Sequence, residues 1–543
     1  MIPHSPRLGR RDVLRLGAGA AAAVLAGCSS SRSARPPVTT APTGATTTMA
    51  APTTVAASSE AWYDFGRSLS GRLVRPSDSG YLTDLQLFDS RFDVVRPAGI
   101  AYCASSTDVQ RSIAFARDHG LPFAARSGGH SYAGYSTTTG LVIDVTSMAT
   151  VSIASGSGGS GSGGSGSGGS GSATVGAGAR LIDVYSSLNA SGVSIPAGSC
   201  PTVGIAGLTL GGGVGVVDRA YGLTCDALSS IEMVTADSRL VTASATVNPD
   251  LYWACRGGGG GNFGIATSFD FNTFQTSPLT LAFLTWPWSA AADVLPAWLG
   301  WAPQAVDQLW SNCILGSDPM GSDPTLQVGV VWIGSPTGIS APLAELAAAV
   351  GSSPSSRYIE TVPFEHAMYV EGGCASFSRA ACHLPNEMTG GLLSRQPSLA
   401  KSGYISAPLG DAGVQAVITG IQARQSQRAA GALGLDAYGG AVNRVDPSAT
   451  AFVHRSALAS AQLSVPFQPG TPSAQLDASL AWLDSWYSDV HPYMDGSAYQ
   501  NYIDAGLAGW ADAYYGANLS RLSQVKQEWD PDDAFHFAQS IPL

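Results

Sequence analysis

The chain has 543 residues, 45% of them hydrophobic and only 12% charged, so it is long enough for two or three domains with sizeable cores. Its 28 Lys and Arg against 39 Asp and Glu give a net charge of −11, without a basic run that could neutralise a phosphate backbone. This balance argues against nucleic acid as a partner.

The first 28 residues have the composition of a targeting segment. Arg10 and Arg11 precede an apolar stretch too short to span a bilayer, which ends in Leu25-Ala26-Gly27-Cys28. The segment resembles a bacterial twin-arginine signal with a lipoprotein box, which implies export of the folded protein and a lipid anchor at Cys28. The alternative is an ordinary cleaved signal with a chance cysteine. We therefore expect an extracytoplasmic, lipid-anchored protein of a bacterial cell envelope, with no other membrane contact.

Residues 29–60 are rich in Ser, Thr, Ala and Pro, so they predict a disordered stalk. Beyond Cys28 the chain has seven cysteines, an odd number for an exported protein, so one should lack a disulfide partner, and Cys200 is the candidate. Cys374 and Cys382 are close enough for a local bridge, although two buried free thiols are equally compatible with the sequence.

Residues 61–276 predict a first domain. From residue 91 an extended apolar piece, a helical pattern and the strand-like "LPFAARS" follow one another in a β-α-β rhythm. The Gly/Ser run 155–172 predicts a solvated loop, "RLIDVYSSLNASG" a helix, and residues 227–244 a hairpin around Ala236-Asp237-Ser238.

Residues 277–490 predict a second domain of α+β type. Apolar strands such as "TLAFLTW" and "LQVGVVWIG" alternate there with helical stretches such as "APLAELAAAV" and "AGVQAVITGIQARQ". Residues 491–543 return to small and aromatic motifs.

Three glycine-rich segments lie within about 140 residues: "RSGGHS" (126–131), "AGSCPTVGIAGLTLGGGVG" (197–215) and "RGGGGGNFGIAT" (256–267). Glycine allows positive φ and lets backbone N–H groups approach a ligand, so together they can line a groove for a pyrophosphate. None fits the strand-G-x-G-x-x-G-helix pattern or the P-loop pattern.

Further motifs accompany these segments in a fixed order: "YGLTCD", "AFVHR", "YQNYID", "YYGANLSRL" and "DPDDAFHFAQSI". Over roughly residues 62–543 the combination resembles the berberine bridge enzyme-like FAD-linked oxidases of the vanillyl-alcohol oxidase and p-cresol methylhydroxylase (PCMH) superfamily. The resemblance implies an α+β fold, with a PCMH-type FAD-binding domain of two subdomains and a substrate domain whose antiparallel sheet lies over the flavin. It also implies that residues 491–543 return to the FAD-binding domain.

The resemblance further implies FAD attached covalently twice, through His130 and Cys200. Taken alone, His130 reads as a loop histidine and Cys200 as a small buried side chain. The other cofactor contacts implied are Arg126, Ser127, Gly128, Gly129, Ser131, Thr202, Val203, Gly204, Gly207, Gly212, Gly213, Tyr221, Asp226, Gly261, Asn262, Gly264, Ile265 and Asn501.

Oxidation of an alcohol needs a base for the O–H proton, and the resemblance selects Tyr502. Since an unperturbed tyrosine has a pKa near 10, we expect a cationic, hydrogen-bonded or flavin-adjacent setting that favours its phenolate. If residues 499–504 are extended, Tyr502 and Asp504 face away from Asn501 and Ile503. The alternative role of Tyr502 is packing on the flavin ring.

Two further catalytic candidates, Asp436 and Tyr438, lie on an expected strand over residues 434–445, where they could polarise Tyr502 or hold the substrate. His454 and Arg455 read as structural. The aromatic side chains Trp286, Trp288, Trp332 and Tyr369 could stack on a substrate or belong to cores. We expect no metal site, because His366 and His383, with Glu371 and Cys374 between them, fit no compact zinc spacing.

The sequence thus predicts an FAD-dependent oxidase. Its substrate would be a small molecule with a C–H bond on a carbon bearing oxygen, either a sugar at its anomeric hydroxyl or a secondary-metabolite alcohol. O₂ is the expected electron acceptor and H₂O₂ the product. Two alternatives stay open: an FAD-dependent dehydrogenase that uses a quinone or another carrier, and a non-catalytic solute-binding lipoprotein.

Overall fold

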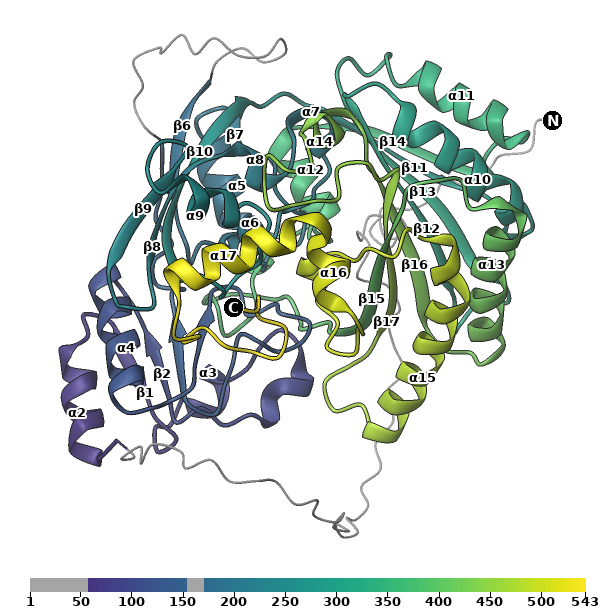
Figure 1. The fold of residues 1–543 in the computed structure, drawn as a ribbon. Helices are drawn as coiled ribbons and strands as arrows, with labels where there is room; N and C mark the ends of the chain where they lie inside the picture. Colours follow the sequence, from purple (N-terminus) through teal and green to yellow (C-terminus); the bar gives the residue numbers. More distant parts are fainter. Residues whose placement is uncertain (1–56, 154–169) are drawn as a thin grey trace.

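The structure is a computed structural model that describes residues 57–153 and 170–543 (Figure 1). The predicted targeting segment, the stalk up to residue 56 and the Gly/Ser run up to residue 169 lie outside the described residues. Two predicted borders shift: α2 (Ser59–Ser68) begins inside the expected stalk, and the last residues of the expected loop belong to β6 (Ser170–Gly176). In the described part of the chain, no helix combines the length and apolarity needed to cross a membrane.

The first sheet has four strands in the order β1-β2-β4-β3. Its β2 (Gly99–Tyr102), β4 (Leu141–Asp144) and β3 (Phe123–Arg126) are parallel, and β1 (Arg72–Val74) pairs antiparallel with β2. The helix α4 (Ser106–Asp118) connects β2 to β3 and buries Val109 and Ile113, which confirms the predicted β-α-β rhythm. The segment "SGGHS" therefore leaves β3 at the carboxyl edge of parallel strands, where ligands of such sheets bind.

The second sheet follows the order β5-β6-β10-β8-β9, and β7 also pairs with β10. The predicted hairpin is formed by β8 and β9, which pair antiparallel. The strands are β5 (Val151–Ile153), β6, β7 (Val193–Ser194), β8 (Leu228–Val234), β9 (Leu240–Ser244) and β10 (Ile265–Gln275). The helices joined to this sheet are α5 (Leu181–Asn189), α6 (Ile205–Leu210), α7 (Asp218–Tyr221), α8 (Thr224–Ala227) and α9 (Pro249–Ala254).

The third sheet has seven antiparallel strands in the order β14-β11-β13-β12-β16-β17-β15. The first of these strands along the chain begins at Leu279, shortly after the expected domain border at 276/277. The strands are β11 (Leu279–Thr285), β12 (Leu309–Ser317), β13 (Thr325–Ile333), β14 (Ser356–Val362), β15 (Ser398–Ile405), β16 (Gly431–Ala437) and β17 (Ala459–Pro466). One face is covered by α10 (Ala291–Trp301), α11 (Ser340–Val350), α13 (Gly410–Ser426) and α15 (Ser473–Val490) (Figure 1).

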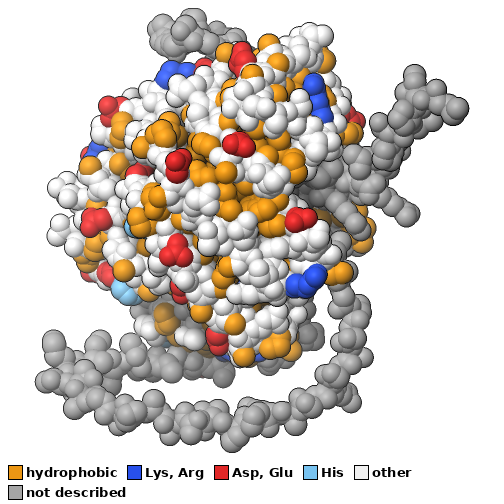
Figure 2. Space-filling model, turned by 90° about the vertical axis from the view of Figure 1, so that its right-hand side faces the viewer, with side chains coloured by type: hydrophobic (Ala, Val, Ile, Leu, Met, Phe, Trp, Pro, Cys, Tyr) orange, Lys and Arg blue, Asp and Glu red, His pale blue; other side chains and the backbone are white. Residues whose placement is uncertain are grey.

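Alternation along the central strands decides which side chains face the helices. Cys313, Leu435 and Leu463 belong to the core between sheet and helices. Because successive side chains of a strand point to opposite faces, Asn312 and Asp436 face away from those helices. On the outer face of these helices, Lys and Arg are few and scattered (Figure 2).

The C-terminal segment returns across the first domain, shown in yellow in Figure 1. It contains α16 (Trp510–Tyr515) and α17 (Leu519–Trp529), and α17 packs against α9. The Lys526 ammonium group is fully buried, where it pairs with Asp530 at 2.6 Å and donates to the Asn262 carbonyl at 3.1 Å. This contact fixes the segment beside the third glycine-rich segment.

Two predicted extended segments are wrong in part. The expected strand over residues 434–445 ends at Ala437, since Gly439 (φ 107°) and Gly440 (φ 54°) turn the chain into α14 (Gly440–Arg444). Gln500–Tyr502 form a 3₁₀ turn in which the Tyr502 N–H donates to the Tyr499 carbonyl at 2.9 Å. The expected alternation of faces around Tyr502 therefore does not occur.

Candidate active site

A cavity of about 750 Å³ lies where the first domain, the third sheet and the C-terminal segment meet. All three glycine-rich segments contribute to its wall. The predicted cofactor residues that line it are Arg126, Ser127, Gly128, Gly129, His130, Ser131, Cys200, Thr202, Val203, Gly204, Gly207, Gly261, Asn262, Gly264, Ile265 and Asn501. The predicted catalytic residues Tyr502 and Asp436 also line the cavity, so residues far apart in the sequence share one site.

The glycines of this wall have two different roles. A Cβ atom on Gly128 would lie 2.2 Å from the backbone nitrogen of Gly204, so these glycines allow the first two glycine-rich loops to touch. A Cβ on Gly207, by contrast, would meet no atom within 4 Å. The backbone at Gly207 is thus open toward the cavity, as a cofactor lying along it would require.

Unpartnered polar atoms in the wall show what kind of group fits the cavity. The Arg126 side chain forms an ion pair with Asp144, but its buried Nη1 has no hydrogen-bond partner among the described residues. The same holds for the buried Oε1 atoms of Gln500 and Gln539. A buried polar atom without a partner is costly, so a ligand with an anionic group and N–H or O–H donors is favoured. FAD, with its pyrophosphate, hydroxyls and ring N–H, meets these demands.

His130 is held in one orientation at the cavity wall. Its Nε2 lies 3.0 Å from the Thr202 hydroxyl, and its ring stacks on Phe88 with centroids 4.0 Å apart. Burial, assisted by the nearby Arg180 cation, lowers the pKa of His130 to about 3. The imidazole is therefore neutral at neutral pH.

Cys200 exposes its thiol to the cavity and is not disulfide-bonded. The surrounding protein raises the pKa of this thiol through burial. The prediction that one cysteine beyond Cys28 lacks a partner is wrong, because Cys103, Cys225, Cys255 and Cys313 are also unpaired; these four are buried. The remaining two form the disulfide Cys374–Cys382, which settles the alternative that the sequence left open.

Tyr502 lies among acidic and aromatic groups. Its ring stacks on Tyr132 with centroids 5.6 Å apart, and the Tyr132 hydroxyl accepts a hydrogen bond from Gln462 Nε2 at 3.1 Å. Burial raises the pKa of Tyr502 well above its usual value, and Tyr132 and Asp436 raise it further. None of these described groups lowers the pKa of Tyr502 toward a phenolate.

Asp436 contributes a carboxyl group to this wall. It lies on β16 opposite Asn312 of β12 in the sheet register. Burial raises the pKa of Asp436 to about 7. A carboxyl group with a pKa near the working pH is well suited to accept and release a proton.

Among the wall residues that the sequence did not predict are Tyr132, Asn312, Glu371 and Gln462. Tyr132 stands two residues after His130, and its place in the motif was the available signal. Asn312 and Gln462 are polar residues inside apolar strands, a pattern that could have indicated a face turned to a ligand. For Glu371 the sequence carried no signal.

Five predicted site residues lie outside the cavity wall: Gly212, Gly213, Tyr221, Asp226 and Tyr438. The backbone N–H of Gly213 donates to the Tyr499 hydroxyl at 2.9 Å, and a Cβ on Gly212 would press on Phe452. Tyr221 stacks on Phe274 with centroids 3.8 Å apart. The Tyr438 hydroxyl lies 3.3 Å from that of Tyr404, where both side chains are buried.

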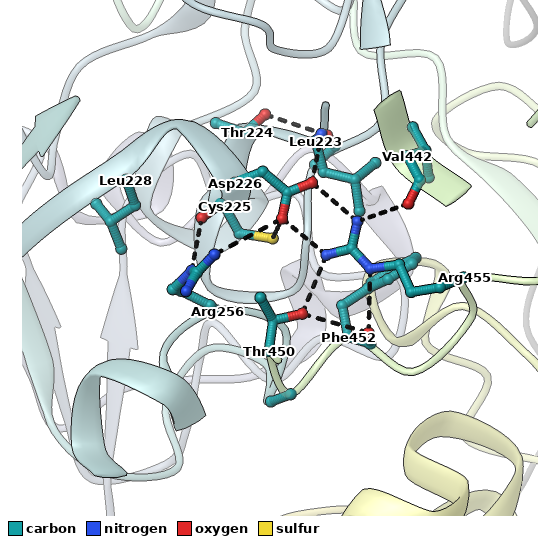
Figure 3. Close-up of polar contacts among 12 residues, drawn as sticks. Leu223, Thr224, Cys225, Asp226, Leu228, Arg256, Val442, Thr450, Phe452 and Arg455 are labelled. Carbon is teal, nitrogen blue, oxygen red and sulfur yellow. Dashed lines mark hydrogen bonds and ion pairs between the residues drawn. The ribbon is translucent and has the colours of Figure 1, made fainter. Parts of the chain in front are cut away.

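Asp226 instead binds Arg455 (Figure 3). The Arg455 guanidinium donates two hydrogen bonds to the Asp226 carboxylate, at 2.7 and 2.8 Å, and a third to the Thr450 hydroxyl at 3.0 Å. Leu223 N–H donates to the same carboxylate at 2.9 Å. Asp226 and Arg455 therefore join α8 to the loop that follows α14.

The other predicted candidates have structural surroundings. Trp286, Trp288, Trp332 and Tyr369 pack in or against hydrophobic cores away from the cavity wall. His383 binds Asp183 at 3.0 Å, and the His454 ring stacks on Tyr404. Among residues 57–153 and 170–543 no group of three or more His, Cys, Asp or Glu side chains is placed to hold a metal ion.

Comparison with known proteins identifies related chains. Residues 97–244 match the family described as FAD binding domain, and residues 498–542 match the family described as berberine and berberine like. The chain is 32% identical over 483 residues to "Uncharacterized FAD-linked oxidoreductase YgaK" of Bacillus subtilis. The aligned region covers 87% of this chain and 97% of that protein. It is 29% identical to a xylooligosaccharide oxidase of Thermothelomyces thermophilus, over 84% of this chain and 90% of that one.

The fold agrees with these matches. The structure of BBE-like 1 from Physcomitrella patens is similar with a TM-score of 0.77 and 29% identity, over 89% of this chain and 99% of that one. This likeness confirms the expected α+β architecture with a PCMH-type FAD-binding domain. FAD is the cofactor that this domain binds, and the relatives are named as oxidoreductases and oxidases. The chain therefore belongs to the berberine bridge enzyme-like family of FAD-linked oxidoreductases.

Proposed function

We propose that this FAD-dependent oxidoreductase is an oxidase of a hydroxyl-bearing small molecule, with FAD attached through His130 and Cys200. The preferred substrate is a sugar oxidised at its anomeric hydroxyl, and a secondary-metabolite alcohol is the alternative. One observation carries the proposal: His130 and Cys200 line the same cavity as Asp436 and Tyr502. The sugar class draws support from the relative named as a xylooligosaccharide oxidase.

The surroundings of His130 and Cys200 suit covalent attachment. The neutral His130 imidazole forms a hydrogen bond between its Nε2 and the Thr202 hydroxyl. In the tautomer with the proton on Nε2, the Nδ1 lone pair is free to attack an electrophilic carbon. The Cys200 thiol lies on the same wall, open to the cavity. Since burial raises its pKa, Cys200 must lose its proton as its bond forms.

Bound FAD would accept a hydride from the substrate carbon and pass the electrons to O₂, which yields H₂O₂. The chain's own task is to hold the hydroxyl and remove its proton. We favour Asp436 over Tyr502 as the base, because burial raises the pKa of Asp436 to about 7, whereas the pKa of Tyr502 is raised well above its usual value. The role of Tyr502 is then to orient the substrate with its phenol O–H, in place of the role as base that the sequence predicted.

The experiment is to reduce the purified enzyme with a panel of sugars and alcohols, with and without air, while recording its flavin absorbance. We expect bleaching by a sugar without air, and recovery of the colour with H₂O₂ release when air is admitted. Asp436→Asn should slow bleaching by about 10²- to 10⁴-fold, whereas the matched control Asp411→Asn on α13 should not. Bleaching without reoxidation by air would indicate a dehydrogenase, and a colourless protein would indicate a solute-binding protein.

We also propose that the protein is exported by the twin-arginine route and anchored through a lipid at Cys28. Arg10, Arg11 and the sequence Leu25-Ala26-Gly27-Cys28 support this proposal. Fractionation of bacteria that express the chain tests it: Cys28→Ser should move the enzyme from the membrane to the soluble extracytoplasmic fraction, and unchanged membrane association would contradict it.

A further inference from the structure

Glu371 is a buried acid on the cavity wall. It is the last residue of α12 (Phe364–Glu371), only 6% of its surface is exposed, and it lines the cavity. Its carboxyl group has no hydrogen bond or ion pair with any described residue. The next residue, Gly372, is so close to the loop of Cys200 that a Cβ there would lie 2.9 Å from the Ser199 carbonyl oxygen. Glu371 therefore stands beside the expected cofactor attachment.

Asp436 reaches the same cavity from β16 and has no hydrogen bond or ion pair with the described residues either. Two nearby arginines form their contacts with other groups, although the buried Nη1 of Arg180 has no partner among the described residues. Arg219 donates to backbone carbonyls, including that of Leu309 at 2.7 Å, and Arg180 pairs with Glu387 at 3.0 Å. The two cavity carboxyl groups thus lack a protein cation.

Burial and mutual repulsion determine how these two carboxyl groups titrate. Burial, followed by the charge of Asp436, raises the pKa of Glu371 to about 8. The other titratable groups that face the pair are Tyr502 and Asp218, and burial also raises the pKa of Asp218 to about 8. No basic group opposes these effects, so the pair retains about one proton near neutral pH and titrates as a unit. It offers one hydrogen-bond acceptor and one donor.

An acid without a partner in a cavity is costly unless a ligand completes its hydrogen bonds. We propose that Glu371 and Asp436 form one substrate subsite, in which Asp436 accepts the proton of the reacting hydroxyl and protonated Glu371 donates a hydrogen bond to a neighbouring oxygen of the same substrate. The inference rests on the proposed function and narrows it. Preferred substrates carry the reacting hydroxyl next to a second oxygen, as a cyclic hemiacetal does.

The reaction is balanced without any proton transfer by Glu371. The substrate C–H bond breaks and its hydride, with two electrons, goes to oxidised FAD. The O–H proton goes to Asp436, and the C–O single bond becomes a C=O bond. Glu371 only orients the oxygen beside the reacting carbon, so it is a positioning residue.

The first test compares D-xylose with its carbocyclic analogue, in which CH₂ replaces the ring oxygen. In the wild-type holoenzyme kcat/KM should favour D-xylose, and Glu371→Leu should reduce that preference about tenfold. Glu371→Gln, which keeps a donor, should largely retain it. The control is Glu365→Gln on the same helix, because Glu365 binds Ser186 and Tyr369 and does not line the cavity. An unchanged preference in Glu371→Leu would overturn the subsite.

The second test is the pH profile of kcat/KM. Activity should rise as the carboxyl pair loses its first proton near pH 7, and fall as the pair loses its second proton near pH 8. Glu371→Gln should abolish the alkaline fall, and a fall that persists unchanged would contradict the donor role.

A third readout does not depend on turnover. Infrared spectra at pH 7 should show protonated-carboxyl absorbance that is lower in Glu371→Gln than in the wild type and unchanged in Glu365→Gln, while Asp218 absorbs in all three proteins. Absence of a Glu371-dependent band would contradict the inference alone. If the wild type shows the band but neither D-xylose nor its carbocyclic analogue reduces its flavin, the sugar class of the proposed function is contradicted. The proposed subsite is then contradicted with it.

Discussion

Arg455 and Asp226 show how a motif residue can serve the fold rather than the cofactor. The Arg455 side chain is fully buried and its guanidinium is bidentate on Asp226 (Figure 3). Charge-assisted bidentate pairs are strong, and the surviving partner of a broken buried pair is left as an uncompensated charge. The pair therefore stabilises the junction between α8 and the loop after α14.

We predict that Arg455→Ala lowers the free energy of unfolding by about 3 kcal/mol, because the largely buried Asp226 then keeps only the more distant Arg256, at 3.9 Å, as a counter-ion. The matched control is Arg444→Ala, which breaks an exposed pair with Asp307 and should cost about 0 to 1 kcal/mol. Denaturant unfolding followed by fluorescence measures both. Equal losses in the two variants would contradict the structural role of Arg455.

At the residue scale, the sequence could predict side chains that belong to a motif. His130 and Cys200 were identified through the motifs that carry the family resemblance, and the structure places both on the cavity wall. Glu371 could not be identified, since only the folded position of α12 brings it to the cavity. Asp226 was assigned to the cofactor because its partner Arg455 lies 229 positions away along the chain.

At the scale of elements, one irregular segment closes part of the cavity. We call residues 372–397 the cavity strap, since Leu384, Leu393, Ser394 and Gln396 line the cavity from it. The disulfide Cys374–Cys382 closes a loop within the strap. Ion pairs of Arg379 with Asp183 at 2.7 Å, Glu387 with Arg180 at 3.0 Å and Arg395 with Asp93 at 2.8 Å hold it to the first domain, as does the contact of His383 with Asp183. With few backbone ladders of its own, the strap depends on these side-chain contacts.

We predict that the double variant Cys374→Ser/Cys382→Ser lowers the free energy of local opening of the strap by about 2 to 3 kcal/mol. The reason is that the disulfide no longer closes a short loop. Limited proteolysis should then cut within residues 372–397 faster than in the wild type. A reductant should accelerate cleavage of the wild type but not of the double variant. Equal cleavage rates for both proteins without reductant would argue against this role of the bridge.

The length of a pattern decided which elements could be predicted. The helices α4, α11 and α13 have long amphipathic or apolar patterns and were predicted, as was the hairpin of β8 and β9. The segments around Tyr438 and Tyr502 were expected to be extended and are not. Near Tyr438 the positive φ of Gly439 ends the strand, and near Tyr502 the residues Gln500–Tyr502 form a 3₁₀ turn instead of an extended segment.

At the scale of the whole molecule, the cavity joins three parts that are separate in the sequence. The glycine-rich segments come from the first domain, Asp436 from the third sheet and Tyr502 from the C-terminal segment. Motif order predicted this arrangement through the family resemblance. Periodicity alone predicted two domains but not that their interface would contain the site.

The central claim is that FAD is bonded to both His130 and Cys200. The most direct measurement is the mass of tryptic peptides from denatured protein, with His130→Ala and Cys200→Ala as single-tether controls. We predict a species whose mass is the sum of the His130 peptide, the Cys200 peptide and one FAD. In His130→Ala the flavin should stay on the Cys200 peptide, and in Cys200→Ala it should stay on the His130 peptide. The claim would be contradicted if the peptides that contain His130 and Cys200 had only their amino-acid masses and free FAD were found in the supernatant.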